Sequence, residues 1–373
     1  MKLYNTATSE LEEFQASPIV NIYTCGVTPY DSTHIGHAAV FITFDVLQRR
    51  LRSLGHETRL VRNVTDIDDD ILRKSNELGV YYRDLVDSEV KKFNKDMRSL
   101  NILESWSEPL ATSAMKEIIE FSEQALESNH AYEVEGTVFF SVKSWPKFGE
   151  LSGYDRETML KFAAERGGFP DDDRKKDPLD FVLWQAAVEG EPSWDSPWGK
   201  GRPGWHIECS ALASKEFGEQ IDIHGGGSDL IFPHHECELA QSEAINQKPF
   251  VKLWMHQAMV RMDGEKMSKS LGNMSFVSEL VKTYDPRTIR LAITKNHYRT
   301  EWEWADDQLA EADEQLQRWI SNKNNRVDPN LFSSVGEALD NDLDTPVAAS
   351  LIVEASNSGF DVTRAADLIG IIL

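Results

Sequence analysis

The chain has 373 residues, of which 40% are hydrophobic and 27% are charged. This length fits two or three domains with sizeable cores, and the composition excludes a fibrous, disulfide-scaffolded or largely disordered protein. With 39 basic against 62 acidic side chains, the net charge of −23 disfavours a polyanionic partner such as tRNA, although some tRNA-binding enzymes are also acidic.

The N-terminus runs directly into polar sequence without an apolar leader, and no later apolar run is long enough to span a membrane. We therefore expect a cytoplasmic protein without membrane contact and take a monomer as its simplest state. The three cysteines cannot all pair with one another, and a reducing compartment would not favour a disulfide. Metal binding or burial is expected for them.

Residues 18–66 predict a strand–loop–helix–strand unit. The β-branched run Ile19–Thr24 predicts the first strand. Apolar residues at helical spacing over 37–54 predict a helix that ends before Gly55, and Thr58–Val64 predicts the second strand.

Residues 70–130 predict two amphipathic helices separated near Ser107–Pro109. The stretch 135–204 is richer in Gly, Pro and Trp and carries a strand signal at Thr137–Val142. It is expected to be an insertion packed on the first domain.

Strand signals return at Gln220–Ile223, and a helix is predicted after Pro233. Asp263–Gly264 predicts a tight turn. From Asp306 onward the pattern is mostly helical, with one apolar face that includes Leu309, Leu316 and Ile320.

A histidine motif, His34-Ile35-Gly36-His37, follows Cys25–Tyr30 between the first predicted strand and the helix. Amides at a helix N-terminus favour anions, imidazoles donate to phosphate oxygens, and Gly36 lets a nucleotide approach the backbone. Taken alone, the motif is explained equally well by two solvated loop histidines.

A lysine motif, Lys266-Met267-Ser268-Lys269-Ser270, follows the predicted turn. Two lysines three apart can neutralise triphosphate charge as pyrophosphate leaves, whereas a surface Lys/Ser loop is the alternative. Both motifs in one chain form the paired signature of the class I aminoacyl-tRNA synthetases, which this chain resembles.

A metal site is predicted from Cys25, Cys209, His234 and Glu238, of which the last two are spaced i, i+4 on one helical face. Two thiolates with an imidazole favour zinc, and the wide scatter of the ligands favours a catalytic over a structural ion. Burial of Cys25 and Cys209 as small thiols is the alternative. A thiolate-binding metal would reject serine and alanine better than an apolar pocket can, so cysteine is the expected substrate.

With these residues assembled, the chain resembles cysteinyl-tRNA synthetases and, more closely, the shorter cysteine:glucosaminyl-inositol ligases of mycothiol biosynthesis. Both families share segments like Gly204–Ser210, His224–Asp229 and Phe232–Glu236. Three stretches favour the ligases, namely Thr28–Thr33, Ser152–Arg156 and Glu165–Pro170. Phe169 stands where the ligases have Asp, and Val40 replaces a Thr that touches the adenylate.

The resemblance implies a Rossmann-like class I catalytic domain with a parallel sheet. It divides the chain into a first catalytic half with a helical hairpin (1–134), an inserted connective region (135–204), a second catalytic half (205–285) and a C-terminal helical bundle (286–373). It also implies ATP as a substrate, with Mg²⁺, and His34, His37, Lys266 and Lys269 as catalytic residues. The residues implied to bind ATP or the adenylate are Cys25, Gly26, Val27, Thr28, Gly36, Asn63, Val64, Thr65, Trp205, Gly227, Ser228, Asp229 and Val260.

The expected reaction joins L-cysteine to ATP as cysteinyl-adenylate and then transfers the cysteinyl group to the amine of glucosaminyl-inositol. A shortened cysteinyl-tRNA synthetase is the main alternative: Glu238 matches that family's fourth zinc ligand, while the short sequence after Asp342–Pro346 argues against an anticodon reader. The third alternative is a binding or regulatory protein that descends from a synthetase and has lost its catalytic activity. Asp31 and His37 are the candidate general bases of the transfer step.

Overall fold

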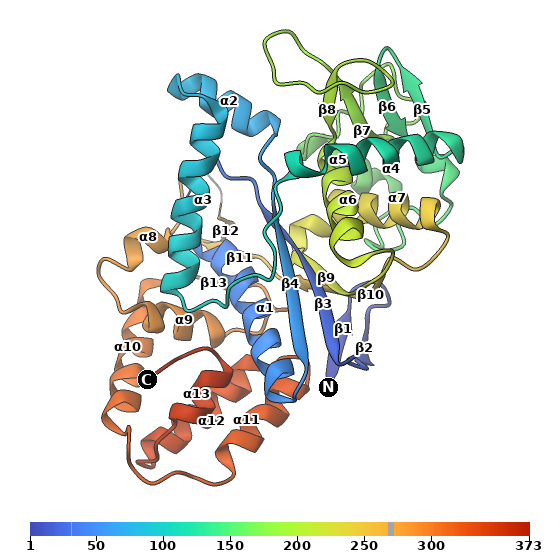
Figure 1. The fold of residues 1–373 in the computed structure, drawn as a ribbon. Coiled ribbons are helices and arrows are strands. Elements are labelled where there is room, and N and C mark those ends of the chain that lie inside the picture. Colours follow the sequence, from blue (N-terminus) through green and yellow to red (C-terminus); the bar gives the residue numbers. More distant parts are fainter. Residues whose placement is uncertain (31, 268–271) are drawn as a thin grey trace.

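The computed structural model describes residues 1–30, 32–267 and 272–373, with the side chains of Lys266 and Asp306 left aside. At its centre is a parallel sheet of four strands in the order β10-β9-β3-β4, namely β10 (Val251–Gln257), β9 (Ile221–Gly227), β3 (Ile19–Val27) and β4 (Glu57–Val64). Figure 1 shows this sheet between the inserted region and the C-terminal helices. The predicted fold class is therefore confirmed.

Strand β3 is longer than the predicted Ile19–Thr24. Its pairing with β4 is irregular between Thr24 and Val27, and Val27 then pairs with Val64. Cys25–Val27, which the sequence placed in the loop, thus belong to the carboxyl end of the strand. In open α/β sheets this end forms the ligand-binding crevice.

Helix α1 (Ile35–Ser53) confirms the predicted helix and packs against α9, α11 and α13. The His34 side chain caps its N-terminus by accepting the His37 amide at 3.4 Å. The positive charges of Arg50 and Arg52 lie in the last turn, where they interact favourably with the negative end of the helix dipole. Gly55, at φ +95°, follows the helix as predicted.

The prediction of two helices over 70–130 is wrong, because α2 (Asp69–Leu78), α3 (Tyr82–Ser99) and α4 (Met115–Glu127) occupy this stretch. Gly79 caps α2 at φ +66° and separates it from α3. The apolar periodicity continues across that break, which is why the sequence suggested one helix.

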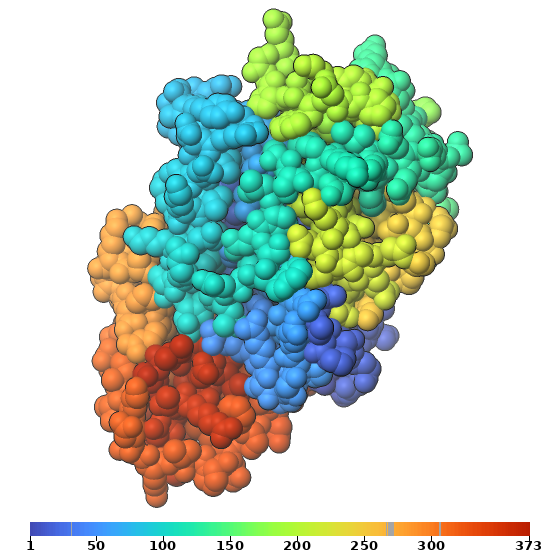
Figure 2. Space-filling view, viewed as in Figure 1, coloured from blue at the N-terminus to red at the C-terminus, as the bar shows by residue number. Residues whose placement is uncertain are grey.

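The inserted region (135–204) supplies three strands of an antiparallel sheet, and β5, just before it, supplies the fourth. The order is β5 (Ala131–Val134), β6 (Thr137–Phe140), β7 (Phe181–Ala186) and β8 (Gly201–Pro203). Of these strands, sequence analysis predicted only β6. Three helices, α4, α6 (Trp205–Phe217) and α7 (Glu236–Asn246), contact one another, and α5 (Arg156–Glu165) lies over the turn before α7. The space-filling view shows this region at the end of the molecule opposite the C-terminal helices (Figure 2).

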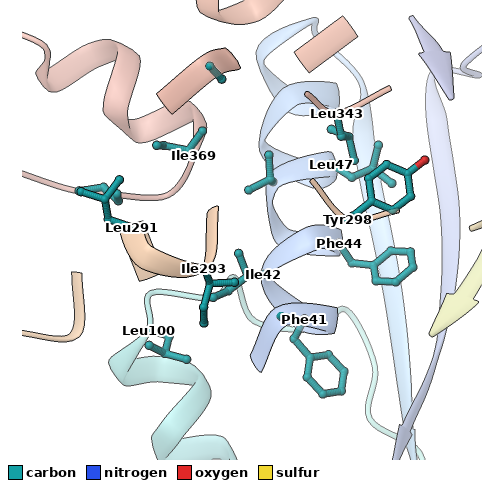
Figure 3. Close-up of a cluster of buried hydrophobic side chains, with 14 of the residues drawn as sticks. Phe41, Ile42, Phe44, Leu47, Leu100, Leu291, Ile293, Tyr298, Leu343 and Ile369 are labelled. Carbon is teal, nitrogen blue, oxygen red and sulfur yellow. The ribbon is translucent and has the colours of Figure 1, made fainter. Parts of the chain in front are cut away.

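The C-terminal helices are α9 (Pro286–Thr294), α10 (Asp306–Ser321), α11 (Leu331–Asp340), α12 (Thr345–Asn357) and α13 (Thr363–Leu368). They share a core with α1, in which Phe44 and Leu47 lie close to Tyr298 and Leu343 (Figure 3). Leu309 and Leu316 are fully buried, as their spacing predicts. The buried Arg290 guanidinium pairs with Asp45 of α1 and ties these helices to the sheet domain.

The remaining elements are short. The hairpin β1 (Lys2–Asn5) and β2 (Glu10–Glu13) flanks the sheet, and α8 (Val277–Leu280) precedes α9. The predicted turn at Asp263–Gly264 joins β11 (Val260–Met262) to β12 (Glu265–Lys266), while β13 (Trp302–Glu303) pairs with β11. None of the described helices combines the length and apolar character that a membrane span requires.

Candidate active site

A cavity of about 1640 Å³ lies at the carboxyl ends of β3, β4 and β9 and extends beneath the inserted region. Most of the predicted site residues line it: Cys25, Gly26, Val27, Thr28, His34, Gly36, His37, Asn63, Thr65, Trp205, Cys209, Gly227, Asp229, His234 and Val260. Val64, Ser228 and Glu238 do not contribute to its lining. Lys266 belongs to β12, whereas Lys269 and Asp31 lie outside the described residues.

One end of this cavity, which we name the nucleotide end after its predicted role, carries His34, Gly36 and His37. The two imidazole rings stack with centroids 3.8 Å apart. A Cβ atom on Gly36 would meet the His34 ring at 2.9 Å, so any larger residue would force this ring to shift. The motif combines two donor rings with the N-terminus of α1, which suits phosphate oxygens.

Gly26 brings β3 and β4 unusually close together. A Cβ atom there would lie 1.5 Å from the Asn63 carbonyl oxygen, which excludes any larger residue. The Gly26 amide donates to Asn63 Oδ1 at 2.8 Å, and Asn63 Nδ2 donates to Thr65 Oγ1 at 3.4 Å. These contacts align the ends of both strands along one side of the cavity.

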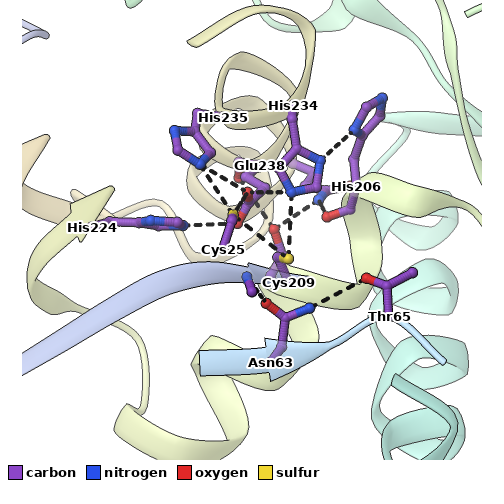
Figure 4. A network of polar contacts seen from close by, with 12 residues as sticks. Cys25, Asn63, Thr65, His206, Cys209, His224, His234, His235 and Glu238 are labelled. Atoms are coloured by element: carbon purple, nitrogen blue, oxygen red, sulfur yellow. Dashed lines mark hydrogen bonds and ion pairs between the residues drawn. The ribbon is translucent and has the colours of Figure 1, made fainter. Parts of the chain in front are cut away.

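The four predicted metal ligands meet at the other end of the cavity, and we name Cys25, Cys209, His234 and Glu238 the donor cluster (Figure 4). The two sulfurs are 3.8 Å apart, and His234 Nε2 lies 3.4 Å from the Cys209 sulfur. Glu238 Oε1 lies 3.0 Å from His234 Nε2 and 3.5 Å from the Cys25 sulfur. Four such donor atoms around one point can hold a metal ion.

Further imidazoles surround the donor cluster, and sequence analysis gave them no role. His206 Nδ1 lies 2.9 Å from His234 Nδ1, and His224 Nε2 lies 3.0 Å from Glu238 Oε2. His235 contacts the Cys25 sulfur at 3.1 Å and His256 at 2.7 Å. His224 and His235 form a second group of donor atoms with Cys25 and Glu238. The sequence did offer one signal for two of these residues, because His224 and His235 lie inside the segments shared with both families.

Burial controls the protonation of this end of the cavity. It lowers the pKa of His206 and of His256 to about 3, and it moves the pKa of His234 and His235 well below the usual range. These imidazoles are therefore neutral, which metal ligation requires. Burial, the Cys209 thiol and the Glu238 carboxylate raise the pKa of Cys25, an effect that a divalent cation would reverse.

Two more residues that sequence analysis did not single out shape the cavity. The Arg166 guanidinium donates to the carbonyl oxygens of Asp229 and Phe232, which fixes the segment that carries His234. Glu208 lies between Trp205 and Cys209 on the face of α6 that lines the cavity. Phe169 lies at the rim with its side chain 68% exposed and its backbone at φ +43°.

The sheet order, the capped histidine motif and the cavity at the carboxyl ends of the strands define a class I synthetase-type nucleotide-binding domain. The Mycobacterium tuberculosis methionyl-tRNA synthetase in complex with methionyl-adenylate shares this fold. Its TM-score is 0.66 at 14% identity, over 94% of this chain and 89% of that one.

Residues 12–314 match the family described as tRNA synthetases class I (C) catalytic domain, so the chain belongs to that family. A relative from Thermobispora bispora named L-cysteine:1D-myo-inositol 2-amino-2-deoxy-alpha-D-glucopyranoside ligase is 44% identical, over 94% of this chain and 88% of the relative. The cysteine–tRNA ligase of Klebsiella pneumoniae is 45% identical, over 95% of this chain and 78% of that ligase. The expected resemblance to both families is confirmed.

Proposed function

We propose that this protein activates L-cysteine with ATP as cysteinyl-adenylate and transfers the cysteinyl group to the amine of glucosaminyl-inositol. The observation that carries the proposal is the donor cluster, which stands in the same cavity as the histidine motif. The relatives named as ligases of cysteine and an amino-glucosyl inositol support the choice of both substrates. A monomeric, cytoplasmic enzyme is part of the same proposal.

The donor cluster fits Zn²⁺. Tetrahedral zinc with bonds of about 2.3 Å to sulfur and about 2.0 Å to nitrogen places two sulfurs about 3.8 Å apart, and sulfur and nitrogen about 3.5 Å apart. The corresponding separations here are 3.8 Å and 3.4 Å. A zinc ion held by these residues would bind the substrate thiolate, which serine and alanine cannot supply.

The nucleotide end would bind ATP, with Mg²⁺. His34 and His37 would donate to phosphate oxygens, and the Gly36 backbone would allow the nucleotide to approach α1. Lys266 and Lys269 are proposed to stabilise the leaving pyrophosphate. The cysteine carboxylate would attack the α-phosphate in line, a step that needs positioning and charge neutralisation rather than a protein nucleophile.

The remaining predicted residues would line the adenylate between the two ends. Cys25–Thr28 and Asn63–Thr65 come from adjacent strand ends, where Gly26 and Asn63 are joined by a hydrogen bond. The Trp205 ring stacks on His234 with centroids 4.2 Å apart and would cover the cysteinyl moiety. Gly227, Ser228, Asp229 and Val260 would lie toward the adenosine.

A second candidate function, charging of tRNA with cysteine, is favoured by one observation. Glu238 lies within the donor cluster, as the four-ligand site of cysteinyl-tRNA synthetases implies. The relatives named cysteine–tRNA ligase are as similar in identity as the ligases are. Identity alone therefore does not choose the acceptor.

Two assays test the proposal with zinc-loaded enzyme. Cysteine-dependent exchange of pyrophosphate into ATP should occur without any acceptor, and its absence would leave a non-catalytic protein as the remaining reading. Acceptor profiling then compares glucosaminyl-inositol with total tRNA under the same conditions. Transfer to the amine is the expected result, and transfer to tRNA alone would establish the second candidate.

A further inference from the structure

One wall of the cavity, which we name the acidic wall, carries five carboxylates and two guanidinium groups. It runs from the N-terminus of α2 past β8 to α6, and its charged members are Asp68, Asp69, Asp70, Glu191, Glu208, Arg73 and Arg202. Such a wall repels phosphates and attracts small cations.

Both arginines of the acidic wall are already paired with carboxylates. Arg202 pairs with Asp69 and lies 3.4 Å from Glu191, and Arg73 lies 2.5 Å from Asp70. Among the described residues, the carboxylates of the wall that no arginine pairs with are those of Asp68 and Glu208.

Glu208 is held deep in the wall. It is only 1% exposed, and its Oε2 atom has no hydrogen-bond partner among the described residues. Because Trp205, Glu208 and Cys209 share one face of α6, the carboxylate lines the cavity beside the donor cluster. A buried carboxylate oxygen without a donor is costly unless a ligand supplies one.

Asp68 lies nearer to the mouth of the cavity. Its Oδ1 atom accepts the Asp70 amide at 2.8 Å, so the side chain is fixed as the N-cap of α2. Burial raises the pKa of Asp68, and the neighbouring Asp69 and Asp70 add to the effect, whereas an incoming cation would oppose it. Asp68 and Glu208 are also close enough to interact electrostatically. These two carboxyl groups therefore extend from the cavity mouth to the donor cluster.

We propose that Asp68 and Glu208 form a binding subsite for the protonated amine of the acceptor. This inference rests on the proposed function, because the subsite would hold the amine beside an adenylate near Thr65 and Trp205. One of its carboxylates would accept a proton from the ammonium, and the neutral amine would then attack the cysteinyl carbonyl and form the amide as AMP leaves. It adds the reason for acceptor choice: the acidic wall favours a small cationic acceptor and disfavours the phosphate-bearing 3′ end of an RNA. The exposed Asp69 at the outer end of the wall, 69% exposed, marks the side from which the acceptor enters.

The test uses the full-length, zinc-loaded variants Asp68→Asn and Glu208→Gln, each assayed for pyrophosphate exchange and for transfer to glucosaminyl-inositol. Asn is itself a good N-cap residue and Gln matches Glu in size, so both substitutions remove the ionisable group and retain shape. We expect kcat/KM for the acceptor to fall at least tenfold more than the exchange rate, chiefly through a higher KM for the acceptor. Glu77→Gln, on α2 but outside the cavity, is the matched charge control.

The outcomes separate this inference from the function on which it rests. If the wild-type enzyme exchanges pyrophosphate but transfers nothing to the amine, the proposed function is wrong. If it does transfer and both variants lose exchange and transfer equally, or lose neither, only the subsite is refuted. A raised KM for cysteine in the exchange assay would assign the carboxylates to the α-ammonium group of cysteine and would also overturn the acceptor subsite. Thermal unfolding of each variant checks that the fold is intact.

Discussion

The two ends of the cavity differ in how much of their chemistry is buried and preformed. The donor cluster is at most 7% exposed at any residue, and neutral imidazoles support it from behind. At the nucleotide end, His34 is half-buried and His37 is exposed. The amino acid would therefore be selected in a dry, rigid site, whereas the nucleotide would bind at an open edge to which the lysine motif must contribute from another segment.

The largest effect is expected from removing a sulfur from the donor cluster. Cys209→Ser should lower the zinc content and reduce cysteine-dependent pyrophosphate exchange by about 10³-fold, because a hydroxyl is a poor ligand for zinc. Metal analysis of the purified protein and the exchange assay measure the two effects.

The control for this prediction is Cys237→Ser. Cys237 is also buried, at 1% exposure, but it does not belong to either group of potential metal ligands among the described residues. The Cys237→Ser variant should therefore retain its zinc. Normal metal retention in Cys209→Ser would remove Cys209 from the ligand set and with it the reason for cysteine as substrate.

The opposite end of the cavity is tested by His37→Ala. This substitution removes a phosphate donor from the N-terminus of α1 and should slow exchange by about 10²-fold. Zinc content should stay at the wild-type level, since the donor cluster does not involve this residue. Loss of zinc together with exchange would show that the two ends are not independent.

An intermediate effect is expected from Glu238→Gln. The carboxylate contacts His234 and Cys25 within the donor cluster and His224 behind it, so its loss should weaken zinc binding by about tenfold to 100-fold. Competition with a chelator measures the affinity. Survival of both zinc affinity and the KM for cysteine would favour a site with three protein ligands, Cys25, Cys209 and His234.

What the sequence could predict depended on whether a feature follows from local patterns or from contacts between distant segments. The β3–α1–β4 unit, the turn at Asp263–Gly264 and the four donor residues follow from local spacing or from motifs, and the structure brings each group together as expected. The break at Gly79 and strands β5, β7 and β8 were missed, because apolar periodicity crosses the first and long-range pairing creates the others. The roles of His206 and His256 depend on distances between segments remote in sequence, which no local pattern encodes.

The smallest effect concerns a carboxylate near the nucleotide end. Burial raises the pKa of Asp96 from 3.8 to about 6, with Thr33, the residue before the histidine motif, partly opposing the shift. Between about pH 4 and 6 the native protein thus binds a proton that the unfolded chain has released. The contribution of Asp96 to the free energy of unfolding therefore falls as the pH rises through this window, and the loss persists above it.

Asp96→Asn removes this titration and should stabilise the protein at pH 7.5 by about 1 kcal/mol, a modest figure because partial solvation screens the charge. At pH 4, where the wild-type carboxyl is protonated in the folded state, the difference should nearly vanish. Denaturant unfolding at both pH values measures it, with the exposed Asp87→Asn on the same helix as control. An equal gain at both pH values would mean that packing rather than charge is responsible. The buried imidazoles of His206 and His256, whose pKa is lowered from 6.5 to about 3, act in the opposite direction. Between about pH 3 and 6.5 the unfolded chain binds protons that the folded protein does not, so their contribution to the free energy of unfolding rises with pH. Wild type and Asp96→Asn share this contribution, and it cancels in the comparison between them.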